Sequence, residues 1–540
     1  MGLACVPDAP PKVVILPETH VPEKMGLVIW VDGLDINVFN SLLKAGQLPN
    51  ITKYLIKRGV VVESAVASLP TITYANDVSF ATGVFPGHHG IVANKWFDRY
   101  SLIFHDYGFI KTYRDVDFDF TYPTIYELLH DEYTATILVP VRRGATRNID
   151  NWASAGISWY FGLQKNINHL TTVRFELISN VANLTGRWPK FILAYYVTPD
   201  TIGHMHGTTD GHYADMIIDV DRQIGNICQA LEKANLLEKT YITLVSDHGF
   251  VNTPNHFDVV SYFRKNLGIE TINKMFGKNV PFEQRLRHFA KARAVIAVSS
   301  KRFCAIHLRS RKHWWERPTI EEIENFVQKF GTVKDKKTIA KASLPELLAN
   351  QEAIELVVVR AGDNAVRVYN KNGIGIIERI IRDKQKLYRY RVVKGVDPLG
   401  YSTSCPAAKL MDGKYHDAEV WLKASIDTPH PDCVVQLIEL SDSPRSGDIM
   451  LFARDGWDFD SPKHPSNRGG HGGIVRHEII VPWIWAGPGI PHGRTIRAAR
   501  TVNLMPTMLE LIGRAERIKI KLDGISIAKR LKEASRLFEN

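Results

Sequence analysis

The chain is 540 residues long, with 45% of its residues hydrophobic and 23% charged. This is an ordinary globular composition, with enough apolar material for a large core and roughly three domains. A net charge of +11 is spread thinly along the chain, so a solvated surface explains it better than a polyanionic partner does. The five cysteines are widely spaced and form no C-x-x-C pair, which argues against a disulfide framework and favours a reducing compartment.

The N-terminal residues 1–12 lack both the cationic start and the apolar run of a signal peptide. No stretch approaches the roughly 18 consecutive apolar residues of a membrane span. We therefore expect a cytoplasmic protein without a membrane span.

From about residue 24 to 255, strand-like apolar runs alternate with amphipathic segments. This alternation predicts βαβ units around a mostly parallel sheet. Strands are expected at 26–31, 191–197 and 241–246, and helices at 36–45 and 213–236. In the second of these helices, apolar residues recur at helical spacing, so one face should pack on the sheet.

The region from about 256 to 445 breaks the alternation. Four β-like runs at 354–360, 365–369, 374–381 and 387–393 are separated by turn signals such as Asn372-Gly373 and predict an antiparallel meander. The core pattern then resumes with apolar runs at 448–453 and 478–485 and a helix at 502–512. We expect an α/β fold in which segments 24–255 and 446–530 form one split catalytic core, with helices flanking a mostly parallel central sheet. Residues 256–445 would form an inserted α+β cap that contains the meander.

Acidic and histidine residues follow three of the predicted strands. Asp32 follows the first strand, Asp200 and His204 follow the second, and Asp247 and His248 follow the third. Because the carboxyl ends of parallel strands meet at one edge of a sheet, we expect a single shared site. Asp oxygens mixed with His nitrogens suit a divalent metal such as zinc or a similar ion.

A threonine precedes the next predicted helix. The segment 69–76 reads LPTITYAN, and the chain can be helical from there to residue 82. A hydroxyl at a helix start lies near free N–H donors and the positive end of the helix dipole, which stabilise an alkoxide. Thr73 is therefore a candidate nucleophile, although a threonine at this position is most often a helix cap.

Taken together, these segments resemble the alkaline phosphatase superfamily, and within it the nucleotide pyrophosphatase and phosphodiesterase branch. Residues 82–94 read TGVFPGHHGIVAN, similar to that branch's T-G-x-x-P-x-x-H-G-I run, and Asn94 follows Thr73 by the family's spacing of 21 residues. PDTIGHMHG at 199–207, SDHG at 246–249 and GGHGG at 469–473 resemble its remaining segments. The resemblance covers about 24–255 and 446–525.

The resemblance implies two divalent metal ions, zinc or manganese, and a covalent phosphothreonine intermediate on Thr73. The implied ligands of the first ion are Asp32, Asp247 and His248, together with the Thr73 oxygen. Those of the second ion are Asp200, His204 and His471, with His464 and His477 as alternatives to His471.

Two further residues have implied roles in binding the substrate. Asn94 would donate a hydrogen bond to a non-bridging phosphoryl oxygen, as an oxyanion-hole group does. Tyr74 would either stack on a substrate base or simply pack. A neutral Asn94, without an arginine partner in the matched segments, favours diesters over monoesters.

The implied function is therefore hydrolysis of phosphodiester or pyrophosphate bonds in a small-molecule or nucleotide substrate. A phosphomonoesterase or phosphonate hydrolase of the same superfamily is the alternative, whereas a sulfatase is disfavoured because the C/S-x-P-x-R segment is missing. Residues 309–315, RSRKHWW, mix cations with aromatics as nucleic-acid surfaces do, which leaves a non-enzymatic metal- and nucleic-acid-binding protein as a remote alternative. A solvated loop with a partly buried tryptophan pair explains that segment better.

Overall fold

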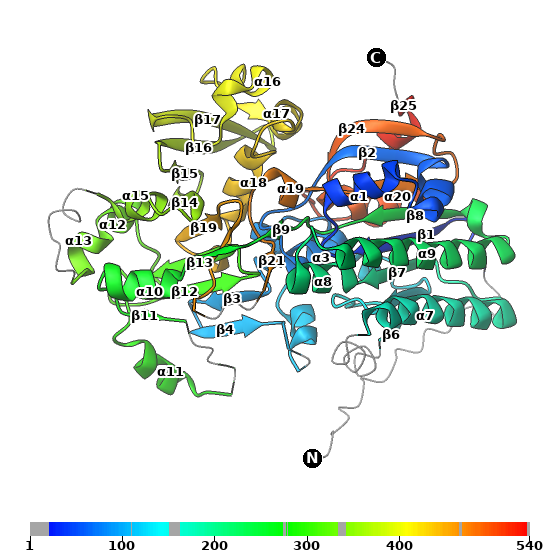
Figure 1. Cartoon of the computed structure of the whole chain (residues 1–540), viewed down its shortest axis with the longest axis horizontal. Helices are drawn as coiled ribbons and strands as arrows, with labels where there is room; N and C mark the ends of the chain where they lie inside the picture. The colour runs from blue at the N-terminus through cyan, green and yellow to red at the C-terminus, as the bar shows by residue number, and fades with distance from the viewer. Residues whose placement is uncertain are drawn as a thin grey trace.

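The computed structural model describes residues 21–536 apart from 110, 151–162, 274–276, 278, 333–341 and 464–466. Two large sheets dominate these residues, a central α/β sheet and a second, mainly antiparallel sheet beside it (Figure 1). The central sheet has the order β25 (Ser535–Arg536), β24 (Arg494–Arg500), β2 (Gly59–Val66), β23 (Trp483–Ala486), β8 (Thr240–Val245), β1 (Met25–Val31), β7 (Phe191–Tyr196), β5 (Thr134–Ile137), β6 (Arg147–Ile149), with β22 (Ile480–Val481) also pairing with β2.

The middle of the central sheet is parallel. Strand β1 runs parallel to both β7 and β8, and β5 and β6 extend the parallel part. Antiparallel β23 then joins β8 to β2. Every residue of β1, β7 and β8 is buried, which explains why these strands appear in the sequence as continuous apolar runs. The expected α/β fold with a mostly parallel central sheet is confirmed.

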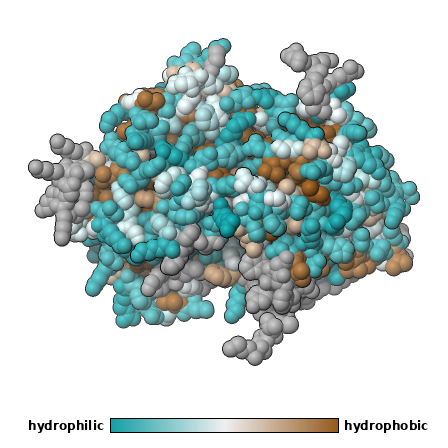
Figure 2. Space-filling model, viewed as in Figure 1, coloured by the Kyte–Doolittle hydropathy of each residue, from teal (hydrophilic) through white to brown (hydrophobic). Residues whose placement is uncertain are grey.

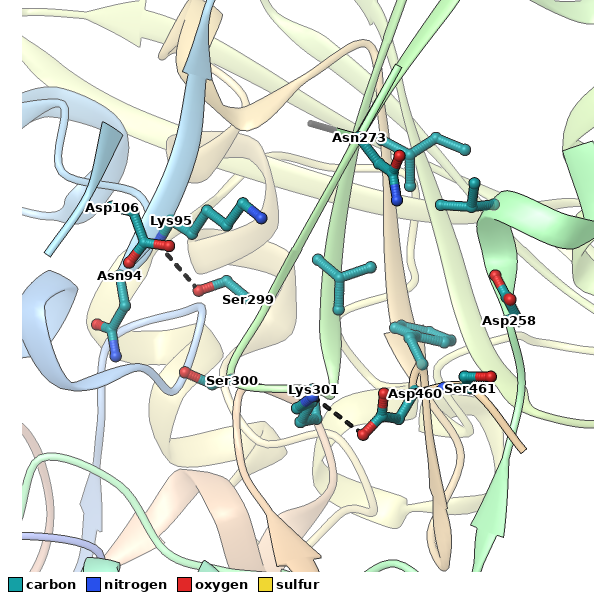
Figure 3. A pocket seen from close by; sticks show the side chains of 14 residues that line it. Asn94, Lys95, Asp106, Asp258, Asn273, Ser299, Ser300, Lys301, Asp460 and Ser461 are labelled. Carbon is teal, nitrogen blue, oxygen red and sulfur yellow. Dashed lines mark hydrogen bonds and ion pairs between the residues drawn. The ribbon is translucent and has the colours of Figure 1, made fainter. Parts of the chain in front are cut away.

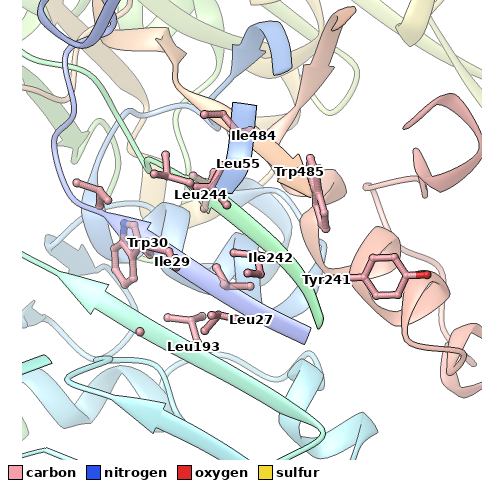
Figure 4. Close-up of a cluster of buried hydrophobic side chains, with 14 of the residues drawn as sticks. Leu27, Ile29, Trp30, Leu55, Leu193, Tyr241, Ile242, Leu244, Ile484 and Trp485 are labelled. Atoms are coloured by element: carbon pink, nitrogen blue, oxygen red, sulfur yellow. The ribbon is translucent and has the colours of Figure 1, made fainter. Parts of the chain in front are cut away.

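Helices cover this sheet, and their packing forms the core. Helix α7 (Gln164–Thr185) contacts both β7 and α9 (Gly211–Lys233). Gly26 in β1 leaves room for Met508 of α20 (Leu504–Leu511), because an added Cβ would lie 2.6 Å from its sulfur. Figure 4 shows the apolar side chains that converge between these elements: Leu27, Ile29, Trp30, Leu55, Leu193, Tyr241, Ile242, Leu244, Ile484 and Trp485.

The second sheet contains the predicted meander, which is confirmed as four consecutive antiparallel strands. Its order is β11 (Thr271–Ile272), β12 (Ala294–Ser299), β13 (Phe303–Leu308), β19 (Ile449–Ala453), β14 (Ile354–Gly362), β15 (Ala365–Asn370), β16 (Gly373–Arg382), β17 (Gln385–Gly395), β18 (His416–Asp417).

One strand lies outside the sheet in which we expected it. The apolar run at 448–453 was predicted to rejoin the central sheet, but it forms β19, which pairs antiparallel with β13 and β14 of the second sheet. All five residues of β19 are buried, and a fully buried strand has the same apolar pattern in either sheet. The division into a split core of 24–255 and 446–530 with a cap of 256–445 stays a prediction.

The two sheets share apolar packing through the segment that carries Thr73. Ala75 and Val78 of α3 (Thr73–Thr82) belong to the same buried cluster as Val295, Phe303 and Leu356 of the second sheet. The hairpin of β3 (Lys95–Asp98) and β4 (Ile103–Asp106) contacts β12. Residues just after Asn94 therefore lie between the central sheet and the second sheet.

The surface agrees with a globular chain. On the face that Figure 2 shows, hydrophobic residues form small patches between hydrophilic ones. No helix in the described part of the chain has both the length and the apolar character that crossing a bilayer requires.

Candidate active site and metal centre

The predicted site residues converge at the carboxyl edge of the central sheet. Asp32 directly follows β1, Asp247 and His248 follow the neighbouring β8, and Asp200 and His204 lie on α8 (Thr198–His206), which follows β7. Because β1 lies between β7 and β8 and all three are parallel, their ends bring these side chains together.

His471 reaches the same place through a separate pairing. The short strand β21 (Gly469–Gly470) pairs antiparallel with β9 (Val251–Asn252), which lies just after β8 and the Asp247-His248 pair. His471 follows β21 directly, and its ring stacks on that of His248 with centroids 3.6 Å apart. His471, rather than the alternative His477, therefore lies in the cluster. His477 contacts Asp455 instead, and His464 lies outside the described residues.

Two groups of ligand-type atoms adjoin each other in this site. In the first group, His248 Nε2 lies 3.3 Å from Asp32 Oδ1, 3.1 Å from Asp247 Oδ2 and 3.2 Å from Thr73 Oγ1. In the second, Asp200 Oδ1 lies 3.5 Å from both His204 Nε2 and His471 Nε2.

The carboxylates each leave one oxygen for a cation. Asp32 Oδ2 accepts a hydrogen bond from the Tyr195 hydroxyl, and Asp247 Oδ1 accepts the Gly33 N–H at 3.2 Å. The opposite oxygens, Asp32 Oδ1 and Asp247 Oδ2, together with Asp200 Oδ1, are buried and have no hydrogen-bond donor among the described residues. A bound cation would satisfy such buried carboxylate oxygens that lack a hydrogen-bond donor.

The histidine rings are oriented to offer their Nε2 lone pairs. Nδ1 lies 3.0 Å from the Gly249 carbonyl in His248 and 2.9 Å from the Thr71 carbonyl in His471. A carbonyl oxygen only accepts, so in each ring Nδ1 carries the proton and donates it, which leaves Nε2 unprotonated in the neutral ring. This is the usual arrangement by which a backbone carbonyl orients a metal-binding imidazole.

The pKa shifts in the site favour the uncharged form of its carboxyl and imidazole groups. Burial, followed by the charges of Asp247 and Asp200, raises the pKa of Asp32 well above its ordinary value, and burial also raises the pKa of Asp200. Burial, followed by the neighbouring His248 and His204, lowers the pKa of His471. Divalent cations would reverse the shift of the two carboxyl pKa values, because they favour ionised carboxylates, and they would lower the pKa of His471 further, because they favour the neutral imidazole.

Thr73 lies at the first turn of α3, whose preceding residue Ile72 has extended backbone. The hydroxyl of the nearby Thr71 donates to the Gly473 carbonyl at 2.9 Å and accepts the Gly472 N–H at 3.1 Å. These bonds join the start of the helix to the loop that carries His471. The segments that carry the predicted nucleophile and the predicted late ligand are thereby hydrogen-bonded to each other.

Asn94 and Tyr74 lie beside Thr73. The Tyr74 N–H donates to Asn94 Oδ1 at 3.0 Å, which orients the carboxamide, and no acceptor in the described part of the chain pairs with its NH₂ group. The Tyr74 hydroxyl donates to the Tyr107 carbonyl at 3.1 Å, and the two rings pack with centroids 5.0 Å apart.

A cavity of about 340 Å³ opens above Asp32, Thr73, Asn94 and Asp200. Aromatic rings form much of its wall, and no lysine or arginine of the described chain lines it. These rings belong to Tyr74, Tyr107, Phe109, Tyr113 and Tyr195. We name this space the aromatic cavity.

Sequence reasoning missed Tyr195 and most of the aromatic cavity. Tyr195 is the fifth residue of β7, and its hydroxyl bonds to Asp32 on the neighbouring strand. An aromatic residue five positions before Asp200 in an otherwise apolar strand was the available signal. Tyr107, Phe109 and Tyr113 lie in and after the β4 region, which carried no recognisable motif.

The basic and aromatic segment 309–315 packs on the protein. Trp314 is buried and donates from its indole N–H to the Phe289 carbonyl at 3.3 Å, and Arg311 pairs with Glu322 at 2.9 Å. Trp315 is 41% exposed and stacks on His313. This arrangement matches the expected loop with a partly buried tryptophan pair and gives no support to a nucleic-acid surface.

Known proteins resemble this chain in sequence. A family model described as type I phosphodiesterase / nucleotide pyrophosphatase matches residues 27–474. The bis(5'-adenosyl)-triphosphatase of Xenopus laevis is 25% identical over 222 residues, which cover 38% of this chain and 44% of the relative. Human ectonucleotide pyrophosphatase/phosphodiesterase family member 5 is 28% identical over 203 residues, which cover 36% and 39%. The chain thus spans less than half the length of these curated relatives.

Solved structures resemble the fold. The human ectonucleotide pyrophosphatase/phosphodiesterase 5 matches with a TM-score of 0.56 and 14% identity, over 94% of this chain and 99% of the other. An inactive Thr-to-Ala form of the murine protein, in complex with AMP, matches with a TM-score of 0.54 and 14% identity, over 95% and 100%. Because the family model matches more than half of the chain, this protein belongs to the type I phosphodiesterase / nucleotide pyrophosphatase family.

Proposed function

We propose that this protein is a metal-dependent hydrolase that cleaves phosphodiester or pyrophosphate bonds of nucleotide-type substrates through a covalent phosphothreonine on Thr73. One observation carries the proposal. Three buried carboxylate oxygens, which have no hydrogen-bond donor among the described residues, converge with histidine Nε2 atoms beside a threonine hydroxyl at a helix start. The curated relatives include a bis(5'-adenosyl)-triphosphatase and a nucleotide pyrophosphatase/phosphodiesterase, which agrees with this substrate class.

The donor set fits two divalent cations. Asp32, Asp247 and His248 would hold one ion next to Thr73, and the other would be held by Asp200, His204 and His471. Mixed carboxylate and imidazole ligands favour Zn²⁺, with Mn²⁺ as the alternative. When bound, the ions would lower the pKa of a coordinated hydroxyl and neutralise charge that develops at the phosphoryl group.

The protein's own residues set up the displacement. The Thr73 hydroxyl would give up its proton to solvent, and Oγ1 would form a bond to phosphorus while the bond from phosphorus to the leaving oxygen breaks; the departing group would keep the electron pair of that bond. Its place at the start of α3 lets the positive end of the helix dipole stabilise negative charge on Oγ1. Water would then attack phosphorus and break the bond to Oγ1, which restores the threonine.

Asn94 would bind a non-bridging phosphoryl oxygen. Its Oδ1 is already occupied by the Tyr74 N–H, so only its NH₂ group remains to donate toward the cavity. One neutral donor and the absence of lysine or arginine from the described lining suit a diester, which carries less charge than a monoester. This arrangement favours a phosphodiesterase over the phosphomonoesterase alternative.

The aromatic cavity would receive the base of the substrate. Its rings provide flat apolar faces for stacking, and Tyr74 is held at the wall by its contacts with Tyr107. The solved murine relative is described in complex with AMP, which agrees with a nucleotide in this class of fold.

The test compares turnover of three substrates by purified protein supplied with Zn²⁺ or Mn²⁺. These are the p-nitrophenyl ester of thymidine monophosphate, p-nitrophenyl phosphate and a phosphonate. We expect the diester to be hydrolysed fastest. Thr73→Ala should lower kcat by about 10⁴-fold or more, whereas Thr73→Ser, which keeps a hydroxyl, should retain part of the activity. Unchanged turnover by a folded Thr73→Ala protein would remove the covalent mechanism, and a preference for the monoester or the phosphonate would favour the alternatives.

A further inference from the structure

Four groups of histidine and acidic side chains in the described part of the chain bring their ligand-type atoms within 4.8 Å of one another. Two of these groups belong to the candidate metal centre, and the other two lie outside it. A basic partner decides whether a group outside the centre can bind a cation, because a lysine or arginine that pairs with a carboxylate already neutralises its charge.

The group formed by His88, Glu439 and Asp523 has such partners. Arg379 pairs with Glu439 at 2.9 Å, and Lys386 also pairs with Glu439. Lys386 Nζ lies 3.8 Å from Asp523 Oδ1 as well. Two basic side chains therefore occupy the space beside these carboxylates, and the group is an ion-pair network rather than a cation site.

Carboxylates in the cavity of about 540 Å³ between the catalytic segment and the second sheet also face basic residues (Figure 3). Lys301 pairs with Asp460 at 3.0 Å, and Lys95 lies directly across the β3–β4 hairpin from Asp106. The third carboxylate of this cavity, Asp258, belongs to no group of clustered ligand atoms among the described residues. This cavity therefore offers no second metal centre.

The remaining group consists of His206, Asp210 and His212. His206 is the last residue of α8, Asp210 caps the N-terminus of α9, and His212 lies in the first turn of α9. The two imidazole rings are nearly parallel, with centroids 4.8 Å apart. Within the described chain, no lysine or arginine forms an ion pair with Asp210, not even Arg468, which lines the same cavity as His206. Two imidazoles and an unneutralised carboxylate are ligands that suit Zn²⁺.

The turn between the two helices is held in place by Asn252 of β9. Asn252 Oδ1 accepts the Thr208 N–H at 2.7 Å, and its Nδ2 donates to Thr209 Oγ1 at 3.3 Å. Gly207 has a positive φ of 80°, and an added Cβ there would lie 2.5 Å from Asn252 Oδ1. These contacts keep the end of α8 beside the start of α9, so the three ligand side chains are close together before any ion binds.

The ligand side chains have room to close around an ion. The side chains of His212 and Asp210 are 67% and 35% exposed, so both can rotate. Ligand atoms at zinc–nitrogen distances of about 2.0–2.1 Å would lie roughly 3.3 Å apart in a tetrahedral site. Asp210 Oδ1 accepts the His212 N–H at 2.9 Å, which leaves Oδ2 for a cation. The carboxylate can therefore cap α9 and bind metal at the same time.

We propose that His206, Asp210 and His212 form a third cation site, separate from the candidate metal centre, which binds a transition-metal ion such as Zn²⁺. Three protein ligands leave the fourth tetrahedral position to water. The ion joins the end of α8, the helix that carries Asp200 and His204, to the start of α9. The inference goes beyond the proposed function and does not depend on it, since the site needs neither a substrate nor the nucleophile.

Counting bound zinc tests the site. The purified full-length protein is dialysed to equilibrium against buffered free Zn²⁺, and the bound metal is measured by mass spectrometry. We expect the His206→Gln, His212→Gln double variant to bind one ion fewer per chain than the wild type. His169→Gln, which removes an exposed histidine of α7, should bind as many ions as the wild type. Equal zinc content in the double variant and the wild type would overturn the inference. Loss of more than one ion would also overturn it, because the histidines would then act on the candidate metal centre.

Asp210→Asn separates metal binding from helix capping. Asparagine caps a helix about as well as aspartate does, so the melting temperature of the metal-free protein should not change. Without the negative charge, calorimetry should show the third ion bound at least about tenfold more weakly. An unchanged zinc affinity would show that Asp210 serves only as a cap, and would contradict the proposed ligand set.

Discussion

Replacing Asn94 tests how the site recognises a phosphoryl group. In the wild type, Asn94 Oδ1 accepts the Tyr74 N–H at 3.0 Å, and this bond prevents the carboxamide from rotating. Its NH₂ group is thus held in place before substrate arrives. Loss of one preorganised donor of this kind costs about 10²–10³ in kcat, or about 3 kcal/mol. We expect that loss for Asn94→Ala.

Asn94→Asp separates the catalytic role from the structural one. An aspartate keeps an oxygen for the Tyr74 N–H, but it places a second, negatively charged oxygen where the NH₂ group was. Repulsion from the phosphoryl oxygens should therefore lower kcat by about a further tenfold beyond Asn94→Ala, which corresponds to about 1.4 kcal/mol. Asn94→Ala instead leaves the Tyr74 N–H unpaired, so its melting temperature should be the lower of the two.

The assay is steady-state hydrolysis of the p-nitrophenyl ester of thymidine monophosphate, with metal content measured by mass spectrometry on each variant. Equal metal content in the three proteins ensures that differences in kcat come from the phosphoryl contact. A kcat for Asn94→Asp close to that of the wild type would refute the assigned role, because a carboxylate cannot donate the required hydrogen bond.

Three further predictions concern the metal centre and a distant charge network. Tyr195→Phe removes the hydroxyl that holds Asp32, so the affinity for zinc should fall about 10–100-fold. Competition with a chromogenic chelator measures this affinity. An unchanged affinity would show that the hydrogen bond does not position Asp32. Dialysis against a chelator should abolish activity and lower the melting temperature, since three buried carboxylate oxygens would lose their cations, and Zn²⁺ or Mn²⁺ should restore both; a metal-free protein with full activity would contradict the proposal. Burial disfavours protonation of His88, but hydrogen bonds to three carboxylates outweigh it and raise its pKa from 6.5 to about 11. The folded pKa is the higher one, so this stabilisation is complete below about pH 6.5 and is lost as the pH rises toward 11. His88→Gln should therefore lower the free energy of unfolding by about 3 kcal/mol at pH 6 and by less at pH 10, and equal deficits in urea titrations at the two pH values would contradict this sign.

Much of the site at the carboxyl edge of the central sheet was predictable because its signals are local. Strands buried on both faces are mostly apolar, so the runs before Asp32, Asp200 and Asp247 stand out as strands that end in carboxylates. Parallel pairing then places their ends at one edge, as the structure has them. Thr73 and Asn94 were identified by their spacing within a recognisable family segment, and both lie at this edge.

Features that depend on pairing between distant segments were not predictable in this way. The run 449–453 is equally apolar in either sheet, and its place between β13 and β14 depends on contacts with segments about 100 residues or more away in sequence. In the sequence, only its flanking glycines distinguish His471 from His464 and His477. In the structure, the β21–β9 pairing places its ring against that of His248.

The site shows most clearly which features the sequence alone determines and which depend on the tertiary structure. Local apolar patterns and strand-end carboxylates were enough to predict the α/β fold and a metal-type site, because strand burial and parallel topology impose them on the amino-acid order itself. The aromatic wall arises only when α3, the segment after β4 and strand β7 come together in the tertiary structure. Residues that line a cavity need share no periodicity or spacing, since their proximity results from the packing of whole elements.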